Sequence, residues 1–229
     1  GDRMVFESLN FTVSAGEVLV LSGPNGSGKS SLLRVMAGLL RSSAGHLSRD
    51  GADVRDDPDA HCADLHYVGH QDAIKPALSV AENVAFWAAL RGARDTAPVH
   101  AALTAFDLQD LADVPGRLLS SGQRRRANLA RLAATPAGLW LLDEPSVGLD
   151  AASTQSLEDL IAAHRKAGGM TGVSTHTALQ LGMAAPLELD RELLLAGALD
   201  SRLYALDADA EGALSWSFQG DNWFWSRPL

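Results

Sequence analysis

The sequence has only one cysteine, Cys62, so an internal disulfide is excluded. This scarcity is typical of a protein from a reducing compartment. Long hydrophobic runs are also missing: the stretch VAFWAAL, for example, is far shorter than the roughly 18 residues that a membrane-spanning helix needs. We find no signal-peptide pattern at the start, where Gly1 replaces the usual methionine and a truncated start is expected. If the protein acts at a membrane, we expect another polypeptide to span it.

Positive charge is scarce as well, with 19 Lys and Arg against 28 Asp and Glu and a formal net charge of −9. Broad attraction to DNA, RNA or an anionic lipid surface is therefore disfavoured. Hydrophobic residues make up 46% of the 229 positions, which is enough to build a core and excludes a disordered chain. The length suits one large domain, or a compact domain with a subdomain.

What the sequence does contain is a phosphate-binding loop. In EVLVLSGPNGSGKSSLLRVMAGLL, a buried strand over 18–21 precedes a glycine-rich loop, and a helix starts near Lys29. Residues 23–30 fit G-x-x-x-x-G-K-[ST] completely. Glycines let backbone N–H groups approach phosphates, and the helix adds the positive end of its dipole. Lys29 is expected to reach the β- and γ-phosphates and the Ser30 hydroxyl to bind Mg²⁺. The expected nucleotide contacts here are Gly23, Pro24, Asn25, Gly26, Ser27, Gly28, Lys29, Ser30 and Ser31.

A second motif, GLWLLDEP, places two acids directly after a buried strand over 139–142. Ligands of open α/β sheets bind at the carboxyl ends of the strands. Asp143 is therefore expected to hold Mg²⁺ through water, and Glu144 to polarise the attacking water. A simpler interpretation is that these acids only cap the next helix. Because the chain also contains a phosphate-binding loop, we favour the catalytic interpretation.

Two further strand ends carry polar residues that suit the same site. The segment GGMTGVSTHTAL predicts a strand over 170–175 that ends at His176, which could contact the γ-phosphate. The segment YVGHQDAIKP predicts a strand ending at Gln71, whose amide could meet the metal ion or the water.

Together these residues resemble the ATP-binding subunits of ABC transporters. The motifs GPNGSGKS, Gln71, LSSGQ, LLDEP, SVGLD and His176 occur in the order and approximate spacing of that family, over residues 1 to about 190. The resemblance implies an α/β P-loop NTPase fold with a mostly parallel central sheet, a small antiparallel β subdomain and an inserted α-helical subdomain, at about 73–134, that carries the signature motif. Its cofactors would be ATP and Mg²⁺.

The resemblance also assigns roles to individual residues. Residues 23–30 would form the Walker A loop. Glu144 would be the catalytic base, and His176 and Gln71 would complete the catalytic set. The metal would be held by Ser30, Gln71 and Asp143, the last being the Walker B aspartate. Asp150 would be the D-loop aspartate.

In this family two chains meet head to tail, and the signature turn completes the ATP site of the opposite chain. Ser120, Gly122 and Gln123 would therefore contact nucleotide held by the partner, helped by the N-terminus of a helix beginning near Ser121. The commonest family form is LSGGQ, whereas position 121 here is serine, which adds a Cβ where backbone approaches phosphate.

The segment HYVGHQDAIKPALSVAENVAFWAAL resembles, more narrowly, the ATP-binding subunits of haem exporters used in cytochrome c maturation. This resemblance implies a homodimer docked peripherally on the cytoplasmic face of the inner (plasma) membrane, against membrane-spanning transporter subunits. ATP hydrolysis would drive haem delivery, or release of a haem-loaded chaperone, on the other side. No haem is expected to bind this chain directly.

Other functions compete with this prediction. The run Arg124, Arg125, Arg126 suggests nucleic-acid contact, but it lies in the first turns of the signature helix of an acidic chain, and we expect no nucleic-acid partner. Cys62, His66 and His70 suggest zinc or haem ligation, but His66 and His70 fall on the predicted strand that leads to Gln71 and there is no second thiol.

Three alternatives to a haem exporter stay open. One is another ABC exporter. A second is a soluble ABC-type ATPase of DNA maintenance, although no heptad array interrupts the chain. The third is an ATP-dependent switch that binds proteins without transport.

The two ends of the chain depart from the family pattern. The chain starts too late for the usual strand whose aromatic ring stacks on adenine, and Phe6 is a poor substitute because its position suits a strand core. Residues 1–190 are expected to form the ATP-binding domain, with 191–229 as an unassigned tail. In that tail, alternating apolar residues at 214–218 before the turn residues 220–222 predict a small hairpin.

Overall fold

The computed structural model describes residues 9–93, 95–177, 179–182, 184–189, 193–197, 202–207 and 213–219. Phe6 and the predicted turn at 220–222 lie outside these ranges.

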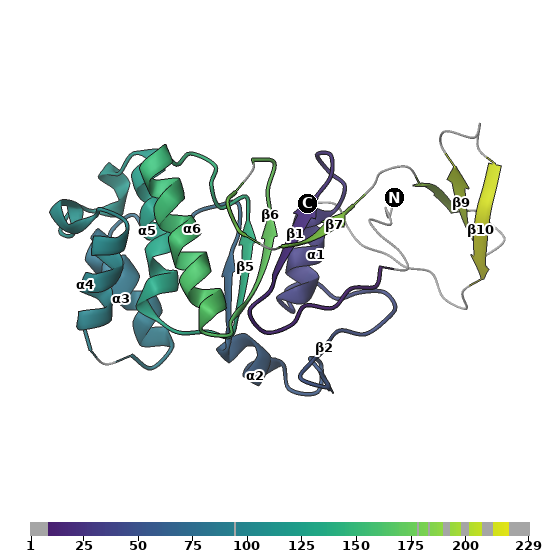
Figure 1. Cartoon of the computed structure of the whole chain (residues 1–229), viewed down its shortest axis with the longest axis horizontal. Helices are drawn as coiled ribbons and strands as arrows, with labels where there is room; N and C mark the ends of the chain where they lie inside the picture. The colour runs from purple at the N-terminus through teal and green to yellow at the C-terminus, as the bar shows by residue number, and fades with distance from the viewer. Residues whose placement is uncertain are drawn as a thin grey trace.

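A five-stranded sheet runs through the middle of the molecule (Figure 1). Its strand order is β4-β5-β6-β1-β7, and every neighbouring pair is parallel. The carboxyl ends of the strands therefore lie along one edge, where the segments that follow them meet. The strands are β1 (Val18–Ser22), β4 (Leu65–Val68), β5 (Leu139–Asp143), β6 (Met170–Ser174) and β7 (Ala185–Glu188).

Side chains along each strand alternate between two hydrophobic cores, one on each face of the sheet. On β5, Leu139 and Leu141 join one core, whereas Trp140 and Leu142 join the other. This double burial explains why β5 is apolar at consecutive positions rather than at alternate ones. On β6 the backbone of Gly172 lies so close to the first core that an added Cβ would be 2.9 Å from Leu141 Cδ2.

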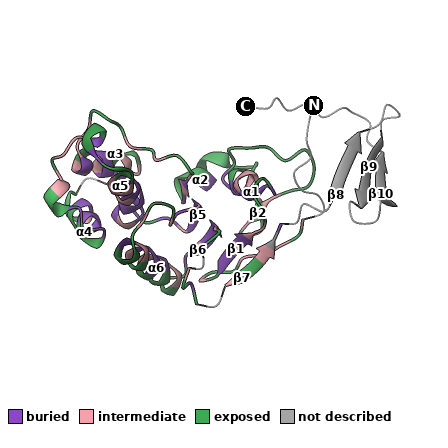
Figure 2. Ribbon diagram, turned by 90° about the horizontal axis from the view of Figure 1, so that it is seen from above, coloured by how far each residue is buried: buried purple, intermediate pink, exposed green. Residues whose placement is uncertain are grey.

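Two helices cover the two faces of the sheet (Figure 2). Helix α1 (Lys29–Met36) packs its leucines on the first core, against β5 and β6. Helix α6 (Ala151–Lys166) contributes Leu157 and Ile161 to the second core. The predicted helix start at Lys29 is correct. The phosphate loop between β1 and α1 thus joins a strand and a helix that are both firmly packed.

A group of helices packs beside α6, away from α1 (Figures 1 and 2). Helices α3 (Val80–Leu90) and α5 (Ser121–Ala134) each begin with a capping box, in which the N-cap serine and the residue three positions later exchange hydrogen bonds. Helix α4 (Ala97–Ala105) and two 3-10 turns, η1 (Gln109–Leu111) and η2 (Gly116–Leu118), connect them. All lie within the predicted helical subdomain, whose boundaries stay a prediction.

The structure also contains two smaller antiparallel sheets. Strands β2 (Ser48–Arg49) and β3 (Ala52–Asp53) form one and are followed by helix α2 (Pro58–Ala63). The other has the order β10-β9-β8. Its strands are β8 (Leu193–Gly197), β9 (Arg202–Asp207) and β10 (Ala213–Gln219). The alternating residues 214–218 are thus in a strand, and their partner is the strand before them. The predicted fold class is confirmed, including the mostly parallel sheet and the small antiparallel one.

The strand before Gln71 is shorter than predicted. Strand β4 ends at Val68, so Gln71 lies three positions beyond it. Of the two histidines placed on that strand, His66 is in it but His70 is not. Gly69 and His70 follow the last ladder residue, where the chain turns away from β5 and the apolar pattern gives way to polar residues.

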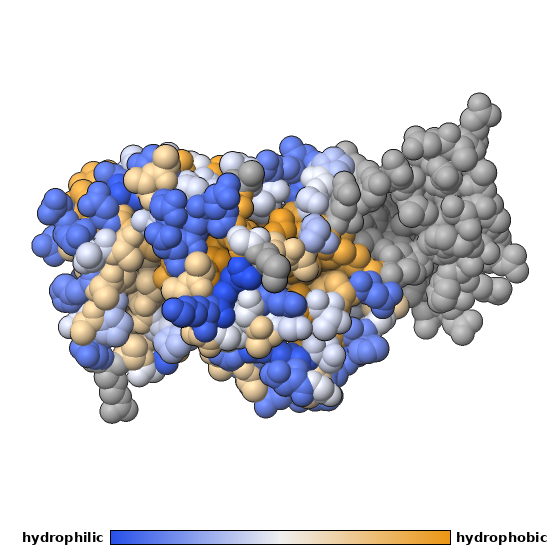
Figure 3. Space-filling model, viewed as in Figure 1, coloured by the Kyte–Doolittle hydropathy of each residue, from blue (hydrophilic) through white to orange (hydrophobic). Residues whose placement is uncertain are grey.

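On the face drawn in Figure 3, hydrophilic residues cover much of the helices, and hydrophobic residues show mainly toward the middle, over the sheet. Within the described residues, no helix combines the length and the hydropathy needed to cross a bilayer.

His66, on the outer strand β4, is buried in an aromatic cluster. Its Nε2 lies 3.0 Å from the Thr135 carbonyl, and its ring meets Trp140 edge-on. Trp140 stacks on His164 with 3.8 Å between ring centroids. Burial lowers the pKa of His66 to about 4, and the nearby charge of Arg91 adds to the effect. His66 is therefore a neutral core residue in the folded protein.

This burial predicts that stability falls in mild acid. The unfolded chain has an ordinary histidine pKa of 6.5, so it binds a proton more tightly than the folded chain. The His66 contribution is full above pH 6.5 and is lost as pH falls toward 4, by roughly 3 kcal/mol. Urea unfolding measured across this range should show a smaller loss for His66→Gln than for the parent. Exposed His100→Gln is the control; equal profiles for the parent and His66→Gln would contradict the assignment.

Candidate nucleotide-binding site

The phosphate loop is shaped by glycines with positive φ. Gly23, Gly26 and Gly28 have φ of 127°, 76° and 105°. At Gly23 an added Cβ would lie 2.2 Å from the Leu189 carbonyl oxygen, so only glycine fits. Gly28 is the N-cap of α1 and offers no side chain to it. The first N–H groups of α1 are therefore free of a side-chain cap and can receive an anion.

Lys29 begins α1 and is buried, with 6% of its surface exposed. Its Nζ donates to the carbonyls of Gly23 and Pro24, at 2.7 Å and 3.1 Å. The side chain therefore curls back over the loop and brings a positive charge to it. Ser31 lines the same cavity from the first turn of α1.

Asp143, at the end of β5, connects three elements. Its Oδ1 accepts a hydrogen bond from Ser30 Oγ on α1 at 2.9 Å and another from Ser174 Oγ on β6 at 2.6 Å. The residue is 1% exposed, and its Oδ2 is buried without a hydrogen-bond partner in the described part of the chain. A buried carboxylate oxygen without a donor is costly unless a cation or water meets it.

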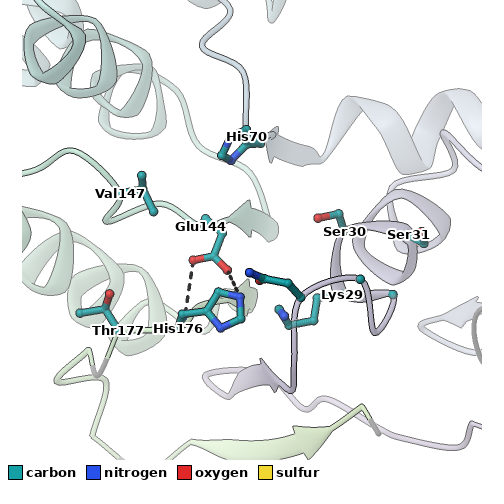
Figure 4. A pocket seen from close by; sticks show the side chains of 11 residues that line it. Lys29, Ser30, Ser31, His70, Glu144, Val147, His176 and Thr177 are labelled. Carbon is teal, nitrogen blue, oxygen red and sulfur yellow. Dashed lines mark hydrogen bonds and ion pairs between the residues drawn. The ribbon is translucent and has the colours of Figure 1, made fainter. Parts of the chain in front are cut away.

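Glu144 follows with a left-handed backbone, φ 49°, which is uncommon for a residue with a side chain. Its N–H donates to both the carbonyl and the hydroxyl of Ser174, at 3.1 Å and 3.0 Å. Its carboxylate faces His176: Oε2 accepts from the His176 N–H and Oε1 lies 3.3 Å from His176 Nε2 (Figure 4). The strained backbone thus turns the carboxylate out of the strand direction and toward the cavity.

Lys29, Glu144 and His176 line one cavity of about 470 Å³ (Figure 4), whereas Asp143 and Ser174 are not in its lining. The α1 side chains line one side, with Glu144, His176 and His70 across from them. The lining residues are Asn25, Gly26, Gly28, Lys29, Ser30, Ser31, His70, Glu144, Val147, His176 and Thr177. The cavity therefore combines a helix N-terminus and a lysine, which suit phosphate, with a carboxylate and a histidine that suit proton transfer.

The model of the ABC transporter family matches residues 6–147, more than half of the chain. The chain belongs to the ABC transporter family. It is 60% identical to the cytochrome c biogenesis ATP-binding export protein CcmA of Rhodospirillum rubrum, over 83% of this chain and 81% of that protein. The CcmA of Paramagnetospirillum magneticum is 55% identical over 83% and 89%. Both resemblances inferred from the sequence, to ABC ATP-binding subunits and to the cytochrome c subgroup, are confirmed.

Solved structures agree with the family assignment. A dimeric ATP-binding cassette bound to ADP and Pi is 26% identical, has a TM-score of 0.72 and covers 81% of this chain and 86% of its own. An ABC transporter ATP-binding protein from Pyrococcus furiosus, 24% identical with a TM-score of 0.73 over 82% and 92%, shares the fold.

The resemblance reaches further along the chain than residue 190. The CcmA of Ruegeria pomeroyi is 43% identical over 212 residues, 93% of this chain. An alignment of that length cannot fit within residues 1–190, so the tail is part of the relationship. The predicted division of the chain into a domain over 1–190 and a tail over 191–229 stays a prediction.

Several predicted site residues of the ABC chain lie outside its own cavity. Gln71 is exposed and does not line it, whereas its neighbour His70 does. Asp150 caps α6 by accepting from the Ser153 N–H at 2.8 Å. Hydrogen bonds from Ser153, first from its side chain and then from this N–H, lower the pKa of Asp150. It too is absent from the lining.

The signature turn also lies away from the chain's own cavity. Ser120 caps α5: its Oγ accepts from the Gln123 N–H at 3.2 Å, and Gln123 Oε1 accepts from the Ser120 N–H at 2.9 Å. Gly122 packs near the Gly148 carbonyl, 3.0 Å from where a Cβ would stand. Ser121 starts the helix and is exposed.

The arginines that suggested nucleic-acid contact bond to carbonyls of the fold, and the residues that suggested a metal site lie in different surroundings. Arg124 donates to the Leu119 carbonyl, and Arg126 to those of Phe106 and Asp107. Cys62 is exposed, whereas His66 is in the core. Among the described residues, no three His, Cys, Asp or Glu side chains come together as a metal site.

Sequence reasoning missed three residues of the cavity lining, His70, Val147 and Thr177. It also missed two residues that bond to Asp143 and Glu144. Ser174 pairs with Asp143 in the parallel register of β5 and β6 and contacts both acids. Arg125, considered only as part of a basic run, is buried beneath Glu144. The position of Ser174, one residue before the end of a predicted strand, was a weak signal for its role. The sequence around Arg125 gave no local signal.

Proposed function

We propose that this chain binds and hydrolyses ATP as the ATP-binding subunit of a membrane exporter that serves cytochrome c biogenesis. The observation that carries the proposal is the meeting of Lys29 and Ser30 with Glu144 and His176 around one cavity. Buried Asp143 accepts a hydrogen bond from Ser30 of that lining. The export role for which the CcmA relatives are named supports the same function.

Each residue has a distinct task in the proposed reaction. Lys29, now bonded to loop carbonyls, would exchange those partners for β- and γ-phosphate oxygens. Residues 23–31 would enclose the phosphates. Glu144 would accept a proton from the attacking water as the new bond between water oxygen and γ-phosphorus forms and the bond from γ-phosphorus to the bridging oxygen breaks, which releases ADP and phosphate. His176 would contact the γ-phosphate beside it. The contact between Glu144 and His176 supports a shared role around one water molecule.

A magnesium ion fits the residues present. Hydroxyl and carboxylate oxygens are its preferred ligands, and Ser30 and Asp143 bring them together at 2.9 Å. No described residue donates a hydrogen bond to Oδ2 of buried Asp143, and a cation, or a water bound to one, would satisfy this oxygen. Gln71 would reach this site only after its segment moves, because it is exposed outside the cavity. When bound, the ion would neutralise charge on the β- and γ-phosphates.

We also propose the head-to-tail homodimer. Ser120, Gly122 and Gln123 would close over nucleotide held by a second copy, with Asp150 near the same interface. The exposed signature turn at the start of α5, apart from its own cavity, supports this arrangement. So does the dimeric cassette structure related to this chain. Ser121 adds one Cβ to that interface.

The proposed setting is the cytoplasmic face of the inner membrane, against integral subunits of the exporter. Haem would be the cargo of the complex or of the chaperone that it loads, without binding to this chain. The naming of the relatives as export proteins supports a membrane partner.

Complementation would test this role directly. In cells lacking the chain, we expect holo-cytochrome c to be restored by the parent gene and not by Glu144→Gln. The parent should also co-purify with membrane-spanning subunits, and its ATPase rate should change in their presence. Added DNA should leave that rate unchanged. Restoration by the Glu144→Gln gene, or DNA-stimulated turnover without any membrane partner, would contradict the proposal.

A further inference from the structure

The guanidinium group of Arg125 is buried, and all three of its nitrogen atoms donate hydrogen bonds to other parts of the protein. Arg125 lies in the second turn of α5, and its side chain is 5% exposed. A guanidinium has five N–H donors, and in this structure it makes five hydrogen bonds between 2.6 Å and 3.1 Å. The acceptors are the carbonyls of Gly69, Asp143, Glu144 and Pro145 and the carboxylate of Asp72.

Three of these bonds hold the backbone around the proposed base. Nη2 donates to the Asp143 and Glu144 carbonyls at 3.0 Å and 2.6 Å, and Nε to the Pro145 carbonyl at 3.1 Å. Ser174 holds the Glu144 N–H from the other side. Hydrogen bonds therefore hold both peptide groups of Glu144, whose backbone is left-handed. Such a conformation costs about 1–3 kcal/mol and persists only where the surroundings impose it.

The other two bonds reach the segment after β4. Nη1 donates to the Gly69 carbonyl at 3.1 Å and to Asp72 Oδ1 at 3.0 Å. Asn128, one turn further along α5, donates to the same Asp72 oxygen at 3.2 Å. Between Gly69 and Asp72 lies His70, which lines the cavity. One buried side chain therefore joins the signature helix, the Gln71 segment and the proposed catalytic strand end.

We propose that Arg125 is a positioning residue for ATP hydrolysis, which holds the Glu144 backbone so that its carboxylate faces the water and the γ-phosphate. This inference rests on the proposed ATPase function. Arg125 does not line the cavity, so it acts through Glu144 and not on nucleotide. Lysine cannot replace it, because one ammonium group has three donors and no planar fork to reach acceptors on both segments.

The test compares Arg125→Lys with the parent in steady-state ATPase and nucleotide-binding assays. We expect kcat to fall at least tenfold while the nucleotide Kd changes less than threefold, because the phosphate loop is untouched. In a Glu144→Gln background, single-turnover hydrolysis should change less than twofold when Arg125→Lys is added, because the base is already missing. Asp72→Asn, which keeps the side-chain shape, should lower kcat three- to tenfold and serves as the milder variant.

Arg131→Met is the matched control. Arg131 is another buried arginine of α5, and it bonds the Tyr67 carbonyl. Its replacement should lower Tm and leave kcat within threefold. An equal loss of turnover on adding Arg125→Lys to the parent and to Glu144→Gln would overturn the positioning role, as would a tenfold rise in nucleotide Kd. A parent chain without ATPase activity, or a Glu144→Gln variant as active as the parent, would overturn the proposed function and this inference with it.

Discussion

Glu144→Gln is expected to reduce ATP turnover at least a hundredfold while MgATP still binds. Glutamine keeps the shape of the side chain and can still contact His176, but it cannot accept the proton of the attacking water. General-base catalysis contributes typically 10²–10⁴-fold. The phosphate loop, Ser30 and Asp143 do not change, so the closed, ATP-bound dimer should accumulate. Phosphate release measures turnover, and light scattering with MgATP measures the mass of the dimer.

Glu158→Gln provides the control for this prediction. Glu158 is also a buried carboxylate that accepts a backbone N–H, from Gln180 at 2.6 Å, but it does not line the cavity. Its variant should hydrolyse ATP at a rate close to that of the parent and should not accumulate as a dimer. Fast hydrolysis by a parent chain that stays monomeric with MgATP would contradict the head-to-tail scheme.

Lys29→Ala should act one step earlier and weaken nucleotide binding itself. The variant loses the one lysine that lines the cavity within the described part of the chain, together with its bonds to the Gly23 and Pro24 carbonyls. Charge-assisted hydrogen bonds contribute about 1.5–3 kcal/mol each, which corresponds to a rise in nucleotide Kd of roughly 10- to 100-fold. Isothermal titration with ATP and Mg²⁺ measures this directly.

Exposed Lys166→Ala, at the end of α6, is the charge-matched control and should bind like the parent. Thermal melting without nucleotide would establish that Lys29→Ala is folded. If Lys29→Ala bound ATP with the affinity of the parent, the assignment of the cavity as the phosphate site would be wrong. Glu144→Gln and Lys29→Ala thus separate binding from chemistry. Glu144→Gln should retain nucleotide without turnover, whereas Lys29→Ala should bind nucleotide weakly.

The phosphate loop and the acid pair could be predicted because their signals are local. A buried strand, the spacing of residues 23–30 and the helix from Lys29 determine the loop within one short segment. The acids after β5 follow from the apolar run before them. Parallel strands end at a common edge, so a prediction that both segments meet there needed no knowledge of register.

Other parts of the site depend on contacts between distant segments. Strand β4 ends at Val68, where its pairing with β5 stops. In the segment that follows, His70 lines the cavity and Gln71 does not. Ser174 reaches Asp143 only because the parallel register pairs those positions. Neither outcome is encoded in the few residues around the position concerned.

By itself, the sequence determined the fold class, the family and the chemistry of the nucleotide loop, because each depends on short patterns that set backbone shape locally. Only the tertiary structure decided that Arg125, one of three consecutive arginines, is buried beneath Glu144 while its neighbours bond carbonyls elsewhere. Successive residues of a helix point about 100° apart. The packing of α5 against the sheet edge therefore selects which arginine enters the interior, and no composition rule could make that choice.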